Sequence, residues 1–371
     1  MNLVSPTASV TGIHAGGRMI SDEALERLVY LVGCPRSGTT VMAKSFFLHE
    51  DVLGCPSMTR FTNHVWRNRR RVDRRLLRQI FKMPAFYRER RAINSLDRSE
   101  RPMIERRIHD AFATMDLKQL YQLYPLIHSL DPECEKDPSR VTAWADKGND
   151  VNGLFGLARA FPQARFILII RDPRATCASM QGQIEKRRAE ARLTAKRHEA
   201  LVASCLHWRH MMQTFLRFAA RYPERSMFIR YEDFVADAAG TINSMFRFTV
   251  GRPMPEAELN NRFSLFERKT KHDPSARGQG IDGRPLERWK RMLTPDEIAL
   301  VTRITHRTAR KLGYSLDRPA RSMPSLAVLG SAAGWRKRLT QAGKLAYLEA
   351  RESLLVPDCS RTVAPAHRPI R

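Results

Sequence analysis

The sequence predicts an α/β fold in which helices cover both faces of a parallel β-sheet. Four apolar segments are typical of buried strands, and they lie at 28–32, within 141–150, at 167–170 and at 227–231. Segments that suit helices follow each of them. Strands that alternate with helices favour parallel pairing, because each helix carries the chain back across a face of the sheet.

The helices are expected to follow the strands in order along the chain. Asp172 fits an N-cap position and Pro173 the first helical position, so one helix should begin directly after the strand at 167–170. Helices are predicted at about 39–49 and from after 150 to about 161, with two more within 173–221. A further helix should follow the last strand and end near 250, and further helical segments should end near 312.

The 371 residues suffice for one large domain, which we predict to span 25–315 after a flexible lead at 1–24. A basic helical insert is predicted within about 60–130. Its part at 60–107 holds 16 Arg and Lys residues against five Asp and Glu residues. A C-terminal helix and tail should occupy 316–371, either as a surface helix or as a peripheral membrane contact.

The charge of the chain favours anionic partners. Its 64 Lys and Arg residues outnumber 38 Asp and Glu residues, which gives a formal net charge of +26. Such a surface attracts nucleotides, nucleic acids, acidic glycans and anionic lipids. The basic insert contains no recognisable nucleic-acid module and no interleaved aromatic platform, so no specific nucleic acid is predicted as a partner.

The cysteines and the N-terminus favour a cytoplasmic protein. None of the six cysteines forms a C-x-x-C pair, so we expect reduced thiols and no zinc site. The first residues lack the basic and apolar segments of a signal peptide. The apolar run at 166–170 is far shorter than the roughly 20 residues needed to span a membrane.

The segment GCPRSGTT at 33–40 resembles a phosphate-binding P-loop, but Thr39 stands where a nucleotide-hydrolysing loop has Lys. Backbone N–H groups of such a turn can bind an anion without that Lys. Arg36 supplies positive charge instead, and Thr39 and Thr40 supply hydroxyls. The sequence therefore predicts a P-loop-type sheet with a phosphate site that needs no metal.

A second motif, RDPRATCAS at 171–179, completes a resemblance to the sulfotransferases that use 3′-phosphoadenosine 5′-phosphosulfate (PAPS). The likeness spans about 28–312 and is nearest to bacterial, carbohydrate and tyrosylprotein members. It implies that the 5′-phosphosulfate contacts Pro35, Arg36, Ser37, Gly38, Thr39 and Thr40, the 3′-phosphate Arg171 and Ser179, the adenine Tyr231, and a closing loop Arg277 and Gly278.

The resemblance also implies the reaction, in which an acceptor hydroxyl attacks sulfur in line and the nucleotide phosphate leaves. Arg36 and Lys147 are expected to stabilise the charge that develops. Many members carry a Glu as general base after the first helix, but positions 56–59 read Pro-Ser-Met-Thr. We therefore predict Asp146 as the base and His64 as the second candidate.

The acceptor is the least specified part of the sequence. The net charge and the basic insert favour an anionic acceptor: a glycan or glycolipid hydroxyl first, a protein tyrosine or acidic peptide second, and a small molecule third. A basic nucleic-acid-binding protein with a degenerate P-loop is the alternative from another class.

Overall fold

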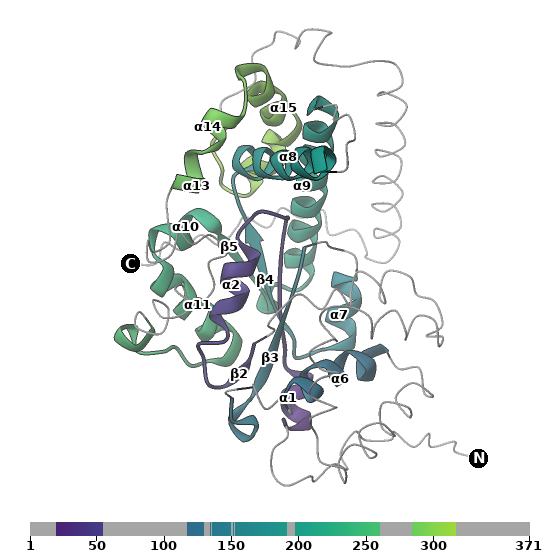
Figure 1. The fold of residues 1–371 in the computed structure, drawn as a ribbon. Coiled ribbons are helices and arrows are strands. Elements are labelled where there is room, and N and C mark those ends of the chain that lie inside the picture. Colours follow the sequence, from purple (N-terminus) through teal and green to yellow (C-terminus); the bar gives the residue numbers. More distant parts are fainter. Residues whose placement is uncertain are drawn as a thin grey trace, which may run out of the picture.

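The computed structural model describes residues 20–54, 117–129, 134, 136–149, 151, 153–190, 197–259 and 284–316. Within them, five strands form one sheet in the order β2-β3-β1-β4-β5, and every pair is parallel (Figure 1). The strands are β1 (Leu28–Gly33), β2 (Val52–Leu53), β3 (Ala143–Gly148), β4 (Arg165–Ile170) and β5 (Ser226–Arg230). The parallel α/β architecture predicted from the sequence is confirmed.

The register places the ends of the central strands at one edge of the sheet. Gly33 at the end of β1 lies beside Ile169 near the end of β4, and Leu31 lies beside Lys147 near the end of β3. In Figure 1 these carboxyl ends point toward α8 (Pro173–Glu190), α9 (Arg197–Arg221) and α15 (Pro295–Lys311). Ligands of parallel α/β sheets bind at such an edge.

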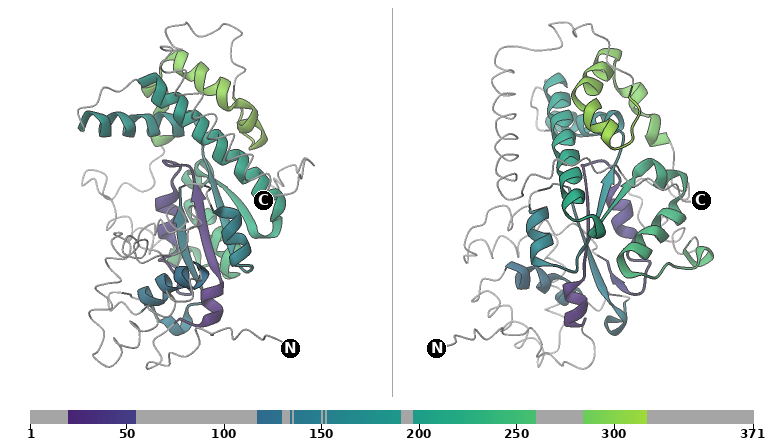
Figure 2. Two further views of the ribbon diagram at one scale, coloured as in Figure 1. Left: turned by 90° about the vertical axis from the view of Figure 1, so that its right-hand side faces the viewer. Right: turned by 180° about the vertical axis from the view of Figure 1, so that it is seen from behind.

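Two layers of helices cover the sheet, as Figures 1 and 2 show. One face packs against α2 (Thr39–Ser45), α10 (Tyr231–Ala236) and α11 (Ala238–Val250). The other face packs against α1 (Asp22–Glu26), α6 (Leu117–Ser129), α7 (Leu154–Ala160) and α9, with α15 outside them. The short helices α13 (Arg284–Glu287) and α14 (Trp289–Met292) precede α15.

Several boundaries differ from the sequence prediction. The helix expected at 39–49 ends at Ser45, where Phe46 and Phe47 donate N–H bonds to carbonyls three residues back. Helix α1 begins inside the segment expected to be a flexible lead. The helix expected up to about 250 is divided, because the Asp237 side chain accepts the Gly240 N–H and caps the start of α11.

Some predicted segments lie wholly or mostly outside the described residues. These are most of the lead, at 1–19, most of the basic insert, up to 116, and the C-terminal segment from 317. The described end of the predicted insert is α6. That helix packs on the core through buried tyrosines, Tyr121 and Tyr124.

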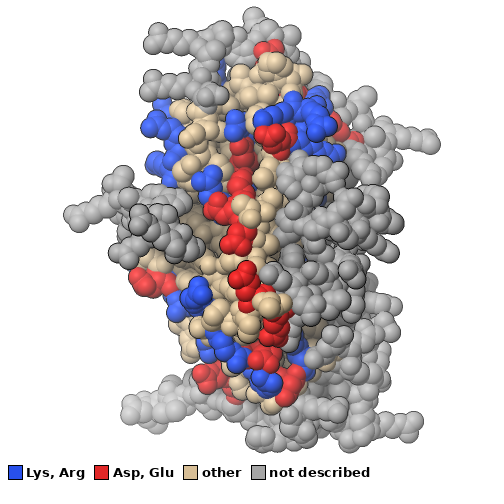
Figure 3. Space-filling view, turned by 90° about the vertical axis from the view of Figure 1, so that its left-hand side faces the viewer, with Lys and Arg blue, Asp and Glu red and all other residues tan. Residues whose placement is uncertain are grey.

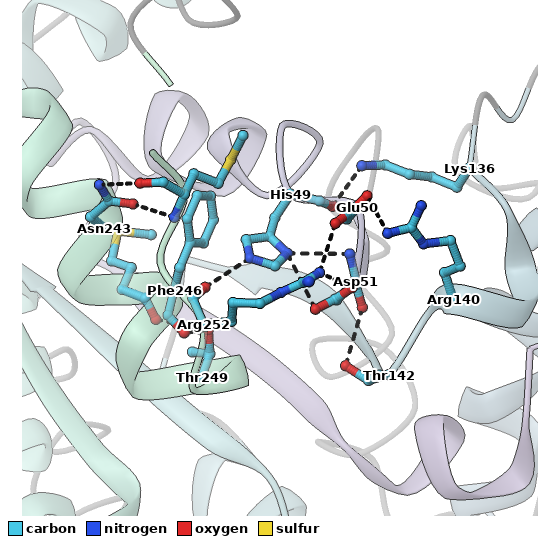
Figure 4. Close-up of polar contacts among 12 residues, drawn as sticks. His49, Glu50, Asp51, Lys136, Arg140, Thr142, Asn243, Phe246, Thr249 and Arg252 are labelled. Atoms are coloured by element: carbon cyan, nitrogen blue, oxygen red, sulfur yellow. Dashed lines mark hydrogen bonds and ion pairs between the residues drawn. The ribbon is translucent and has the colours of Figure 1, made fainter. Parts of the chain in front are cut away.

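An ion-pair network joins three segments near the start of the short strand β2 (Figure 4). Arg252, which follows α11, binds the carboxylates of Glu50 and Asp51, and Arg140 also binds Glu50. The His49 ring shares a 2.8 Å hydrogen bond with the Arg252 carbonyl, and burial lowers the pKa of this histidine. The network fixes the chain just before β2, at the amino-terminal edge of the sheet. The phosphate loop lies at the carboxyl-terminal edge.

Candidate active site

The loop between β1 and α2 has the backbone of a tight anion-binding turn. Arg36 has φ 75° and Gly38 has φ 87°, both in the left-handed region. The Ser37 N–H donates to the Cys34 carbonyl at 3.0 Å, and the buried Ser37 hydroxyl donates to the same carbonyl. The hydroxyl of Ser37 therefore supports the loop, while the side chains of Arg36 and Thr40 are exposed.

Gly38 is required by its surroundings as well as by its backbone. A Cβ atom at this position would lie 2.3 Å from a ring carbon of Tyr231, the first residue of α10. No side chain fits at that separation. The ring of Tyr231 therefore packs directly against the phosphate loop.

The two motifs predicted to bind the two ends of one nucleotide meet in space. Arg36 Nε donates to Ser179 Oγ at 3.1 Å, across a separation of 143 residues. Arg171 Nη1 donates to the Arg36 carbonyl at 2.8 Å. The loop after β1 and the first turns of α8 thus form one continuous polar surface that carries two guanidinium groups.

Arg171 is held as part of the core, since only 7% of its surface is exposed. Its guanidinium lies 4.2 Å from the centre of the Tyr231 ring, and its carbonyl accepts the Trp208 Nε1–H at 3.1 Å. Burial lowers the pKa of Arg171, and the neighbouring Tyr231 and Glu232 partly oppose that effect. A cation that is buried at this cost suits a site that receives an anionic ligand.

Carboxylates behind the loop connect α10 to the start of α8. Glu232 accepts the Asp172 N–H at 2.9 Å and the Tyr314 hydroxyl at 2.9 Å. Arg174 pairs with Asp172 at 2.7 Å and stacks 4.3 Å from the Trp289 ring. These contacts agree with a local capping role for Asp172 and Arg174.

Lys147 lies at the same edge of the sheet. Its Nζ donates to Thr40 Oγ1 at 2.9 Å, although the two residues are 107 positions apart. Thr40 belongs to the first turn of α2, so the ammonium group lies next to the predicted 5′-phosphosulfate loop.

Asp146 points to the opposite face of the sheet. It is only 1% exposed, and its carboxylate accepts the Tyr121 hydroxyl at 2.5 Å and the Lys147 N–H at 2.7 Å. A general base must come within hydrogen-bond reach of the acceptor hydroxyl. The burial of Asp146 is therefore unfavourable for the role of general base predicted from the sequence, and that role stays a prediction.

The remaining predicted residues lie either in the phosphate loop or outside the described residues. Pro35 and Thr39 belong to the loop, where Thr39 is buried against Gly33. His64, Arg277 and Gly278 lie outside the described residues.

Sequence reasoning missed three supporting residues, Tyr121, Trp208 and Glu232. Tyr121 and Trp208 gave no signal, because their partners are remote in the chain. Glu232 could have been noticed, since it directly follows the Tyr231 of the matching segment.

The described residues contain no group of three or more His, Cys, Asp or Glu side chains that could hold a metal ion. Among the same residues, no helix is both long enough and apolar enough to cross a membrane. Figure 3 shows acidic side chains along the middle of one face, with Lys and Arg to both sides. The described part of that face therefore carries both signs of charge.

Comparison with known proteins identifies the class. Residues 29–256, more than half of the chain, match the sulfotransferase family. The chain belongs to this family and is a PAPS-dependent sulfotransferase enzyme. No curated protein matches it closely.

Solved structures support the fold. The sulfotransferase domain of the olefin synthase of Synechococcus PCC 7002 has a TM-score of 0.51 and 15% identity, covering 78% of this chain and 96% of that domain. The sulfotransferase domain of the curacin biosynthetic pathway has a TM-score of 0.51 and 17% identity, covering 78% of this chain and 98% of that domain. At these identities the likeness shows a shared fold.

Proposed function

We propose that this chain transfers the sulfuryl group of PAPS to a hydroxyl of an anionic glycan or glycolipid. One observation carries the proposal for the site: Arg36 contacts Ser179 and Arg171 contacts Arg36, so the two phosphate motifs adjoin. In this proposal the loop at 35–40 binds the 5′-phosphosulfate, and Arg171 with Ser179 binds the 3′-phosphate. Tyr231, Arg277 and Gly278 complete the nucleotide contacts.

Arg36 and Lys147 have the charge that the transfer requires. As the acceptor oxygen bonds to sulfur, the bond from sulfur to the nucleotide phosphate breaks and negative charge grows on the leaving oxygen. A planar guanidinium binds sulfuryl or phosphate oxygens through two N–H groups, and an ammonium adds a compact charge. Cations already in place there stabilise the transition state without reorganisation.

We assign the general base to His64 in preference to Asp146. The Asp146 carboxylate already accepts two hydrogen bonds within the core. A neutral imidazole is a suitable base near pH 7. His64 precedes α6 in the chain, in the segment that we expect to form the acceptor wall.

The choice of acceptor rests on charge. The net charge of +26 and the 16 basic residues at 60–107 favour a polyanion. A protein tyrosine or acidic peptide is the second candidate and a small metabolite the third, and a peripheral membrane contact of the C-terminal segment would suit a glycolipid. Cys34, Cys177 and Cys205 are buried free thiols, which supports the proposed cytoplasmic location.

Calorimetry with adenosine 3′,5′-bisphosphate (PAP), the expected product, tests the nucleotide site. We expect saturable binding that is unchanged by EDTA, since Arg36 supplies positive charge in the loop in place of the P-loop Lys. Absence of binding heat, or binding that requires Mg²⁺, would contradict the proposed site.

The acceptor requires a separate experiment. Incubation of the enzyme with ³⁵S-labelled PAPS and extract of the source organism should label large anionic material that binds an anion-exchange resin. Label found only in small neutral metabolites would refute the polyanionic acceptor.

A further inference from the structure

We propose that Asp146 and Tyr121 form a positioning pair that fixes Lys147 beside the phosphate loop. The inference rests on the proposed function, because it assumes that the Lys147 ammonium acts on the sulfuryl donor. It replaces the role of base expected for Asp146 with an indirect role.

Strand geometry places the side chains of Asp146 and Lys147 on different faces of the sheet. Side chains alternate across a strand, so Asp146 and Lys147 project to opposite faces of β3. Asp146 lies among the residues that pack against α6, while Lys147 reaches α2 and donates to Thr40 Oγ1 at 2.9 Å. Asp146 and Tyr121 thus lie on the face of the sheet covered by α6, and we infer that they act on the Lys147 side chain on the face covered by α2.

The Asp146 carboxylate connects the two sides. Its Oδ1 accepts the backbone N–H of Lys147 at 2.7 Å, and its Oδ2 accepts the Tyr121 hydroxyl at 2.5 Å. Hydrogen bonds to a charged acceptor are stronger than neutral ones, and a buried carboxylate is tolerated only with such partners. The backbone of Lys147 is therefore held at the point from which its side chain departs.

Tyr121 is itself held firmly. Its side chain is fully buried, and its ring makes edge-to-face contacts with Trp144 at 4.9 Å and Phe161 at 6.0 Å. The next residue of α6, Gln122, donates to the Leu25 carbonyl at 3.3 Å. The hydroxyl thus reaches Asp146 from a fixed ring on a fixed helix.

The functional consequence concerns the flexibility of lysine. A lysine side chain has many rotamers, so its ammonium acts best when the backbone at its root is fixed. Helix α6 is also the described end of the basic insert predicted within about 60–130, which we expect to contribute to acceptor binding. The pair therefore links the end of that segment to the residue expected to stabilise the transferred group.

A double-mutant cycle separates this role from ordinary core packing. The reaction is the single-turnover hydrolysis of ³⁵S-labelled PAPS, with water as the acceptor and PAP and sulfate as products. The water oxygen bonds to sulfur, the bond from sulfur to the phosphate oxygen breaks, and the proton of water goes to solvent. Rates are compared for Tyr121→Phe, Asp146→Asn, Lys147→Ala and the double variants with Lys147→Ala. Calorimetric PAP binding is measured on each.

We expect Tyr121→Phe and Asp146→Asn each to slow transfer about tenfold or more, as loss of a hydrogen bond to a charged group would. Dissociation constants for PAP should change less than about threefold. In the Lys147→Ala background, neither change should slow the reaction further. The control Tyr124→Phe alters a second buried tyrosine of α6, which stacks on His128, and should leave the rate unchanged.

Independent losses in the double variants would overturn the proposal, and so would equal behaviour of Tyr121→Phe and Tyr124→Phe. Should Asp146→Asn fail to fold, Tyr121→Phe alone decides the test. A crystal structure of Tyr121→Phe gives a check that is independent of nucleotide binding: an unchanged contact between Lys147 Nζ and Thr40 Oγ1 refutes the pair. Failure of the wild-type chain to bind PAP would instead refute the proposed function.

Discussion

Replacing Arg171 with alanine should remove the ability to recognise a 3′-phosphate. The substitution eliminates the hydrogen bond to the Arg36 carbonyl at 2.8 Å and the stack on Tyr231 at 4.2 Å, together with the guanidinium itself. A hydrogen bond to a charged group contributes about 1.5–3 kcal/mol. At 1.4 kcal/mol per factor of ten, PAP should bind about 10- to 150-fold more weakly.

The assay compares PAP with adenosine 5′-monophosphate, which lacks the 3′-phosphate. Loosening of the phosphate loop weakens both ligands, whereas loss of the 3′ contact weakens PAP alone. The ratio of the two dissociation constants therefore isolates the role of Arg171. Calorimetry on wild type, Arg171→Lys and Arg171→Ala should show the dissociation constant of the monophosphate divided by that of PAP falling in that order. Lysine keeps the charge but loses the planar fork.

Arg174→Ala is the matched control, since Arg174 belongs to the same motif but pairs with Asp172 and stacks on Trp289. It should keep the wild-type ratio. If Arg171→Ala binds PAP and the monophosphate in the wild-type ratio, the 3′-phosphate lies elsewhere and the reasoning fails.

Two further predictions concern stability. Gly251→Ala should cost about 1–2 kcal/mol for its φ of 79° alone, because a Cβ there meets nothing within 4 Å. Gly38→Ala has the same backbone cost plus a clash with Tyr231, so chemical denaturation should show a clearly larger loss, and equal losses would contradict the packing described. Burial and the nearby His210 lower the pKa of His207 to about 4. Since the unfolded chain binds this proton below about pH 6.5 and the folded chain does not, stability should fall by at most about 3 kcal/mol between pH 6.5 and pH 4. Replacing His207 with Gln should flatten the dependence of stability on pH between pH 6.5 and pH 4. An unchanged dependence would show that this histidine is not its cause.

The order of strands and helices could be predicted because the apolar segments are short and bounded by turn residues. β1 is buried along its length and β4 from Phe166 onward, and both stand out as continuous apolar runs. β2 was missed, since two residues that pair only with β3 leave no periodic pattern. The end of α2 was overestimated, because local carbonyl bonds after Ser45 overrode the helical spacing.

The contacts of the candidate site also include some that the sequence could predict and some that it could not. The adjacency of Arg36 and Arg171 could be predicted because each follows a strand, and parallel topology brings strand ends together. Their contacts with the nucleotide stay a prediction. The contacts of Asp146 could not be read in this manner, since strand alternation turns its side chain to the face covered by α6, opposite that of Lys147. Its partner Tyr121 lies 25 residues earlier in the chain, and only the folded structure joins them.

Strand β3 anchors both ends of the chain segment at 55–116. The segment begins after its entrance, β2, which pairs with β3 and is fixed by the ion pairs around Glu50 and Asp51. The segment ends at α6, which bonds to β3 through Tyr121. Insertions and exchanges between two anchors on one rigid strand need not disturb the phosphate loop, which lies at the opposite edge from the entrance. The scaffold therefore suits grafting: a segment from a relative with another acceptor, joined after Gly54 and before Leu117, would inherit the nucleotide site intact.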